Sequence, residues 1–290
     1  MPGLAALGER LLGLSARRRL PAWRRDWSDR AEPTRTGAGA AGEVVLLVDT
    51  FNRWFEPENA IAALRVLEAA GYRVHLPRPV GGGRPLCCGR TFLAAGLVDQ
   101  AKAEARRLIE ALRPYLARGL PVLGLEPSCL LTLRDEFTVM LPGADTEKLA
   151  RRALLLEEFL AAEHAAGRLR LALRALPQRR ALLHGHCHQK AFGVMPAVVA
   201  VLGLIPELEV EPVEAGCCGM AGAFGYEAEH YEMSMRMGEL GLLPAVRSAA
   251  PDTLIVADGT SCRTQIRDGA GRTAVHVARV LERALVAPSG

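Results

Sequence analysis

Short apolar runs alternate along this chain with longer segments in which apolar positions recur every three or four residues. The runs at 43–49 (EVVLLVD) and 121–125 (PVLGL) are continuous, which is typical of strands buried on both faces of a parallel sheet. The segment 57–70 has helical periodicity and ends before Gly71, a residue that suits a helix C-terminus. Strands that alternate with helices pair in parallel through right-handed crossovers, so the pattern predicts an α/β fold.

The same order of elements occurs twice. The predicted strands lie at 43–49, 72–76, 121–125, 180–184, 208–213 and 253–258, and the predicted helices at 57–70, 97–112, 146–166, 190–202, 227–242 and 273–286. We therefore expect two pseudo-symmetric βαβαβα lobes with parallel sheets, each carrying a Cys-Cys-Gly motif. The expected organisation is a basic amphipathic arm and linker at 1–42, a first repeat at 43–145, a helical linker at 146–179 and a second repeat at 180–290.

The N-terminal arm has leucines at helical spacing, which predicts a short amphipathic helix (Leu4, Leu7, Leu11 and Leu14). One interpretation is a helix that docks on a partner or on a membrane surface, which would give residues 1–30 a peripheral membrane contact. The other, which we prefer, is a helix packed on its own domain. Residues 34–42, rich in glycine and alanine, are expected to form a linker.

Half of the 290 residues are apolar, and no apolar run approaches the roughly 20 residues of a membrane span. Charge follows the first apolar stretch instead of preceding it, unlike a secretory signal. We therefore expect a cytoplasmic protein, with attachment at the inner face of the membrane left open by the arm. The net charge of +4 lies within residues 1–36, which hold eight arginines and four acids. The balanced remainder gives no footprint for nucleic-acid binding.

All seven cysteines fall in two copies of one pattern. Cys-Cys-Gly occurs at 87–89 and 217–219, 130 residues apart, and the trailing Cys129 and Cys262 are 133 apart. The second copy has an additional, leading Cys187. Each group follows a predicted strand, at the edge where open α/β sheets bind ligands. In a reducing compartment an odd number of clustered cysteines indicates metal ligands or catalytic thiols more than disulfides.

The glycine after each cysteine pair permits a sharp turn, which can bring two adjacent thiolates to one centre. In the second copy, four thiolates are available, the usual complement of a [4Fe–4S] cluster (Cys187, Cys217, Cys218 and Cys262). Backbone N–H groups of the glycine-rich turn would stabilise its negative charge. Four thiolates also suit zinc, and the spacing alone does not decide between the two.

Three histidines alternate around Cys187, so in a strand they would share one face. For His186 and His188, a role as proton donor or extra ligand beside the centre and a purely structural role are both open. For His184 we expect a hydrogen-bonded histidine at a strand end. No catalytic residue is assigned from the sequence.

The doubled arrangement resembles the cysteine-rich (CCG) domain pair of the heterodisulfide reductase B subunit, the glycolate oxidase iron–sulfur subunit and the lactate-utilisation iron–sulfur proteins. The stretches Glu126-Pro-Ser-Cys129 and His186-Cys187-His188-Gln189-Lys190 look closest to CCG modules of FAD-linked 2-hydroxyacid dehydrogenases. The resemblance covers residues 43–286. It implies an oxidoreductase component with a [4Fe–4S] cluster, FAD bound only on a partner dehydrogenase, and a ferredoxin-type iron–sulfur subunit or domain as a further partner.

The family pattern has, in each copy, a leading cysteine, the Cys-Cys-Gly and a Cys-x-x-Cys. This chain departs from it at Thr50, Glu126 and Gly259, which stand where the first copy's leading cysteine and the first member of each Cys-x-x-Cys would be. The second copy is therefore expected to hold one cluster. In the first copy, an incomplete cluster, zinc with Glu126 as an oxygen ligand, or a structural remnant without metal all stay open (Cys87, Cys88 and Cys129).

The main hypothesis is an iron–sulfur electron-transfer component of a glycolate- or lactate-type dehydrogenase. The three lost ligands favour an alternative, a zinc-stabilised or metal-free scaffold that docks a dehydrogenase partner. A dithiol reductase that uses Cys87 and Cys88 directly is a third hypothesis, which the strain of vicinal disulfides disfavours.

Overall fold

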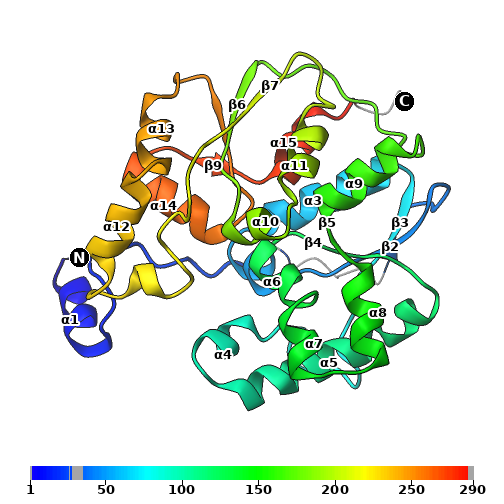
Figure 1. Cartoon of the computed structure of the whole chain (residues 1–290), viewed down its shortest axis with the longest axis horizontal. Helices are drawn as coiled ribbons and strands as arrows, with labels where there is room; N and C mark the ends of the chain where they lie inside the picture. Colours follow the sequence, from blue (N-terminus) through cyan, green and yellow to red (C-terminus); the bar gives the residue numbers. More distant parts are fainter. Residues whose placement is uncertain (1, 26, 28–34, 287–290) are drawn as a thin grey trace. The chain divides into compact units, whose positions relative to one another are not determined.

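The computed structural model describes residues 2–25, 27 and 35–286, and the chain divides into two compact units, each built from three separate stretches. Unit 1 comprises Met1–Ala22, Leu176–Met195 and Glu207–Val277, and unit 2 comprises Trp23–Ala175, Pro196–Pro206 and Ala278–Gly290. Figure 1 labels their elements along the chain. The domain boundaries expected at 42, 145 and 179 stay a prediction.

The sheet of unit 2 has the strand order β1-β3-β2-β4-β5. Its strands are β1 (Arg35–Thr36), β2 (Gly42–Leu46), β3 (Tyr72–His75), β4 (Val122–Gly124) and β5 (Ala153–Leu155). Neighbours pair in parallel except β1, which lies within the expected linker and runs antiparallel to β3 at the sheet edge. Val44, Val45 and Leu46 of β2 are fully buried, as its continuous apolar run predicts.

The sheet of unit 1 has the order β7-β6-β8-β9 and is parallel throughout. Its strands are β6 (Arg180–Leu183), β7 (Glu209–Pro212), β8 (Leu254–Val256) and β9 (Ala274–Val275). Without β1, the sheet of unit 2 repeats this order of four parallel strands. The predicted fold class, two α/β lobes with parallel sheets, is therefore confirmed.

Helices connect successive strands in both units (Figure 1). In unit 2 they are α2 (Thr50–Trp54), α3 (Pro57–Ala69), α4 (Arg90–Ala94), α5 (Val98–Ala117), α6 (Pro127–Thr132), α7 (Glu136–Met140), α8 (Ala144–Arg152) and α9 (Leu156–Ala165). Two further helices, α11 (Met195–Leu202) and α15 (Val277–Ala284), belong to unit 2 except for their first residues. In unit 1 they are α1 (Pro2–Leu12), α10 (Cys187–Ala191), the 3₁₀ turn η1 (Phe224–Tyr226), α12 (Tyr231–Glu239), α13 (Leu242–Ser248) and α14 (Thr260–Ala270).

The sequence did not predict β5 and β9, the last strands of the two sheets. The predicted helix 146–166 is interrupted by β5, and the predicted helix 273–286 begins with β9 before α15 starts. Both strands are only two or three apolar residues long, so they fit into a helical pattern. Their backbone pairs with β4 and β8 instead, because each completes the edge of a parallel sheet. The predicted helix 190–202 also divides into α10 and α11, around Gly193 with φ 69°.

The N-terminal arm contacts unit 1 through the residues that follow its helix, and packing of the helix itself on the domain stays a prediction. Leu14 forms an antiparallel bridge with Glu227, and the Ser15 N–H donates to the Tyr226 carbonyl at 2.7 Å. Arg18 is buried in the same unit. The side chain of Leu4 lies outside the described part of α1, and Leu7 and Leu11 are exposed. Among the described residues, no helix combines the length and apolar character needed to cross a bilayer.

Candidate metal–sulfur centre

The four cysteines of the second copy converge at the carboxyl edge of the unit 1 sheet. Cys187 is the first residue of α10, after β6, and Cys262 lies in the first turn of α14, after β8. Cys217 and Cys218 follow β7. Each thiol is near enough to the next to shift its pKa, in the order Cys187, Cys217, Cys218, Cys262. Residues remote in the sequence meet here because parallel strands end at one edge.

Exposure falls along this series of sulfur atoms. Cys187 is exposed and Cys217 is half-buried, whereas Cys218 and Cys262 are 4% and 1% exposed. All seven cysteines of the chain are free thiols. The centre thus has one open side, at Cys187, and one side enclosed by the core.

The turn of the second Cys-Cys-Gly depends on its glycine. Gly219 has φ 94°, a conformation that disfavours any side chain, and its N–H donates to Cys217 Sγ at 3.4 Å. A Cβ there would overlap the Ser234 carbonyl oxygen of α12. The glycine therefore allows both the turn and the close approach of α12 beneath it.

Interactions between the thiols shift their pKa values in opposite directions. The pKa of Cys217 is lowered to about 2 because it accepts from Cys187 and Cys218 and from the Gly219 N–H. The pKa of Cys187 is raised by its bond to Cys217 and by burial, and that of Cys218 by its bonds to Cys217 and Cys262. The pKa of Cys262 is lowered, first by Cys218. The pKa shifts thus alternate in direction along the series of four thiols.

The neighbours of these cysteines tie the three loops together. Lys190 Nζ donates to the carbonyls of Ala215 and Gly216, just before Cys217. Gln189 Nε2 donates to Asp258 Oδ2 at 2.8 Å, next to the loop that leads to Cys262. Lys190 and Asp258 flank cysteines in the sequence, but their partners could not be read from it.

His186 and His188 both lie beside the Cys187 thiol. The Nδ1 atoms of His186 and His188 are 3.8 and 3.7 Å from Cys187 Sγ, and the two rings stack at 5.1 Å. His186 also caps α10, since its Nδ1 accepts the backbone N–H of His188 at 3.1 Å. Both histidines are therefore beside the centre, and a ligand role for either stays a prediction.

His184 is buried beside Cys262. Its ring is 1% exposed and neither nitrogen makes a hydrogen bond of normal length, but the ring is near enough to Cys262 to lower the pKa of that thiol, so the expectation of a hydrogen-bonded strand-end histidine stays a prediction. Only its backbone continues the sheet, with its N–H donating to the Val256 carbonyl at 2.8 Å. The side chain faces the cysteines, as the alternation of the strand requires.

The three cysteines of the first copy also converge, in unit 2. Thr50 is near enough to Cys87 to lower the pKa of its thiol, and the thiols of Cys87, Cys88 and Cys129 shift one another's pKa values in that order. Gly89 has φ 77°, its N–H donates to Cys87 Sγ at 3.4 Å, and a Cβ would lie 2.9 Å from a backbone oxygen of α5. The turn is the same in both copies.

The charges around the first copy differ from those of the second. Despite a lowering hydrogen bond from Cys88, burial and the carboxyls of Asp49 and Glu126 raise the pKa of Cys129 to about 11. Burial also raises the pKa of Asp49, which caps α2 through the Asn52 N–H at 3.1 Å. Glu126 is 3% exposed. This acidic surrounding opposes thiolate formation unless a cation binds.

The three departures from the family pattern occupy equivalent places in the two units. Thr50 begins α2 as Cys187 begins α10. Glu126 and Gly259 are the N-cap residues of α6 and α14. The positions that correspond between the two copies in the sequence therefore begin or cap equivalent helices in the structure.

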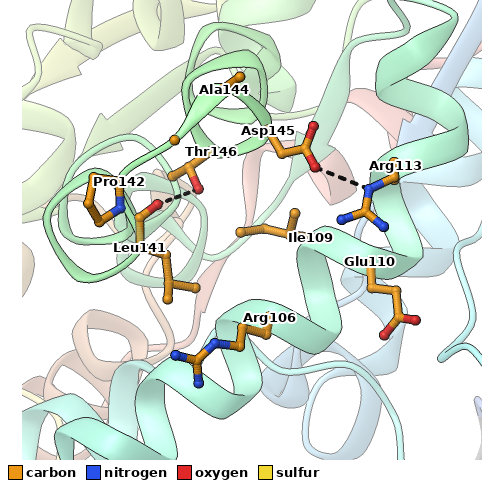
Figure 2. A pocket seen from close by; sticks show the side chains of 10 residues that line it. Arg106, Ile109, Glu110, Arg113, Leu141, Pro142, Ala144, Asp145 and Thr146 are labelled. Atoms are coloured by element: carbon orange, nitrogen blue, oxygen red, sulfur yellow. Dashed lines mark hydrogen bonds and ion pairs between the residues drawn. The ribbon is translucent and has the colours of Figure 1, made fainter.

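A pocket of unit 2 lies between α5, α8 and the residues that precede α8, and no cysteine lines it (Figure 2). Arg113 Nε donates to Asp145 Oδ2 at 3.1 Å across it, and Thr146 Oγ1 donates to the Leu141 carbonyl at 2.7 Å. These polar groups satisfy one another, and nothing connects the pocket with the thiols.

Comparison with known proteins agrees with the residues of unit 1. Residues 181–267 match the family model described as "CCG: Cysteine-rich domain", a segment that holds all four cysteines of the second copy. The chain is 28% identical over 244 residues to the C subunit of the anaerobic glycerol-3-phosphate dehydrogenase of Escherichia coli, covering 84% of this chain and 59% of that protein. The resemblance to cysteine-rich CCG proteins that the cysteine pattern predicts is therefore confirmed.

Two other kinds of relative are similar over nearly the same part of the chain. The D-2-hydroxyglutarate dehydrogenase of Escherichia coli is 27% identical over 83% of this chain, which spans 22% of that enzyme. Lactate utilization protein A 1 of Bacillus mycoides is 24% identical over 78% of this chain and 91% of its own length. The chain thus spans about three fifths of the first relative and about a fifth of the second.

Proposed function

We propose, from the premise that residues 181–267 belong to the cysteine-rich CCG domain family, that this chain is an iron–sulfur electron-transfer component of a dehydrogenase. The observation that carries the proposal is the convergence of four free thiols at one sheet edge in unit 1. A bound cluster would take up and release single electrons there. The residues that would hold it are Cys187, Cys217, Cys218 and Cys262.

The set of ligands in unit 1 is the one that a cluster requires. Four thiolates are the usual complement of a [4Fe–4S] cluster, in which each binds a different iron. The same four thiolates would also suit a tetrahedral zinc ion with Zn–S bonds of about 2.3 Å, and the assay of iron and sulfide distinguishes the two occupants.

The exposure of the thiols suits electron exchange with a partner. Cys187, at the open side, gives a short path from the centre to a docked protein, while Cys218 and Cys262 lie in the core and exclude water. We propose that the partner is an FAD-linked dehydrogenase of a 2-hydroxyacid such as glycolate or lactate, with a ferredoxin-type iron–sulfur subunit or domain as the second partner. Support comes from relatives named as dehydrogenases or for lactate utilization.

The test is anaerobic reconstitution with iron and sulfide, followed by iron and sulfide assay and EPR of the reduced protein. We expect a brown protein whose cluster is lost in Cys262→Ser and retained in Cys129→Ser, the matched cysteine of the first copy. Purified wild-type protein that stays colourless and free of iron under these conditions would refute the proposal. Equal loss of the signal in both variants would contradict the assignment to unit 1.

For unit 2 we propose a second site, zinc held by the three thiols with Glu126 as the oxygen ligand, with an incomplete cluster as the competing occupant. The observation in its favour is the buried Glu126 carboxyl, whose charge acts on Cys129. Metal analysis of purified protein should find zinc in wild type and lose it in both Glu126→Gln and Cys129→Ser. Zinc that survives both substitutions would exclude this site.

A further inference from the structure

Neither nitrogen of the buried His184 ring makes a hydrogen bond of normal length in the described structure, although the ring is near enough to Cys262 to lower the pKa of that thiol. Two residues earlier along the chain, Leu182 of β6 packs in the core cluster that contains Cys218 and Cys262. Side chains two apart along a strand point to the same face, and the backbone of His184 continues the pairing of β6 with β8. The His184 ring therefore faces these two cysteines. A buried imidazole N–H requires an acceptor, and the Cys262 sulfur or a sulfur of a bound group would supply it.

His186 approaches the same region and acts electrostatically on Cys262. Its Nδ1 accepts the His188 N–H at 3.1 Å, so the neutral ring carries its proton on Nε2. A Cβ built on Gly259 would overlap Cδ2 of His186, the carbon bonded to Nε2, and would lie 3.3 Å from Cys262 Sγ. The Cγ–Cδ2 edge of the ring thus fills the space of a side chain at position 259, beside Cys262.

Position 259 is where the family pattern has the first member of its second Cys-x-x-Cys. A cysteine cannot stand there while His186 holds its observed place, because the first side-chain atom would already overlap the ring. Glycine at 259 and histidine at 186 are therefore one coupled replacement. Compared with the family pattern, the site therefore has a neutral imidazole with an N–H group in the place of a negatively charged thiolate.

We propose that His184 and His186 donate N–H hydrogen bonds to sulfur atoms on the Cys262 side of the cluster, and that these bonds raise its reduction potential. The inference rests on the proposed function, since it requires the cluster in unit 1. No proton is transferred and no bond breaks, because the cluster gains one electron while the N–H groups stabilise its added charge. Net charge and hydrogen bonds to sulfur are two of the properties that set cluster potentials.

The experiment uses the full chain, reconstituted anaerobically, with a redox titration followed by EPR. His184→Leu removes the donor, His184→Gln keeps an N–H donor, and His164→Leu replaces an exposed histidine of α9. We expect His184→Leu to retain its iron and to lower the reduced-to-oxidised ratio at the wild-type midpoint at least tenfold, about 59 mV for one electron. His184→Gln should lie between His184→Leu and wild type, and His164→Leu should match wild type. Resonance Raman should show shifted Fe–S stretching frequencies in His184→Leu alone.

A second variant tests the coupled replacement and does not depend on His184→Leu folding. Gly259→Cys alone should lose the cluster, because of the overlap with His186. The double variant His186→Ala/Gly259→Cys should regain it, with a lower potential than wild type. A potential that is unchanged in His184→Leu with iron retained would overturn the inference and leave the electron-transfer function standing. Loss of iron in both His184→Leu and His184→Gln would also overturn it, by making His184 a ligand. A wild-type protein without a cluster would overturn the proposed function and this inference together.

Discussion

Replacing Arg18 by methionine would remove a guanidinium group that is fully buried in unit 1. Its Nε donates to the Gly225 carbonyl at 3.0 Å, and its terminal nitrogens donate to Gln265 Oε1 at 2.6 Å and Ser234 Oγ at 3.0 Å. It is also paired with Asp268 at 3.2 Å, and its side chain is 0% exposed. Through these bonds, one residue of the N-terminal arm joins the segment after Cys-Cys-Gly to α12 and α14.

The size of the effect follows from the groups left behind. Methionine fills similar space but leaves Gly225 O and Gln265 Oε1 buried without this donor, at about 1–3 kcal/mol for each acceptor. Asp268 keeps a hydrogen bond from Arg267 at 3.0 Å, so its loss is smaller. We therefore expect unit 1 to lose about 3–5 kcal/mol, the range found when one partner of a buried ion pair is removed. With about 2–4 °C for each kcal/mol, the melting temperature should fall by roughly 6–20 °C.

The assay is urea and thermal unfolding of the metal-free protein, followed by circular dichroism. Arg17→Met is the matched control, because Arg17 is adjacent in sequence but pairs with Glu232 at the surface, with side chains 60% and 69% exposed. It should unfold almost as wild type does. If Arg18→Met unfolds as close to wild type as Arg17→Met does, the arm is not a structural part of unit 1 and the argument is refuted.

Three further perturbations have equally specific outcomes. Gly219→Ala should destabilise unit 1 by more than the about 1–2 kcal/mol cost of a left-handed residue, because its Cβ also overlaps a backbone oxygen of α12, and urea unfolding would measure this. Hydrogen bonds from Arg118 and then His75 lower the pKa of Glu43 from 4.5 to about 2, so the stabilisation by this carboxylate is complete above pH 4.5 and is lost as the pH falls towards 2. The unfolding midpoints of wild type and Glu43→Gln should therefore differ at pH 6 and converge towards pH 2, and a constant difference would contradict the pairing. Lys190→Met should speed the release of iron to a chelator by freeing the loop before Cys217, whereas an unchanged rate would show that this loop is held by other contacts.

The main elements of the fold were accessible from the sequence because their signals are local. The run at 43–49 forms β2, and the helical segment 57–70 forms α3 (Pro57–Ala69). β2 ends earlier than predicted, at Leu46, since Asp49 turns the chain into α2 by accepting the Phe51 and Asn52 N–H groups. Edge strands of two or three residues, such as β5 and β9, carry no local signal and were missed.

In the candidate site, too, some features could be predicted from the sequence and others could not. That the cysteine groups meet followed from their places after parallel strands, and the equivalence of Thr50 with Cys187 followed from the repeat. The burial of the His184 ring beside Cys262, without a hydrogen bond of normal length, could not be predicted, because hydrogen bonding depends on every neighbour in the folded chain. Gly259 was recognised as a departure from the pattern, but its reason, the ring of His186, is a contact across 73 residues of sequence.

Repeat spacing and hydrophobic periodicity are properties of neighbouring positions, so they were enough to show the two cysteine groups and the order of most strands and helices. The contacts between the thiols, the surroundings of the His184 ring and the bonds from Arg18 of the arm to α12 and α14 depend on the folded chain. Those interactions join residues up to 250 positions apart, so they exist only once the sheet has brought the ends of its strands together.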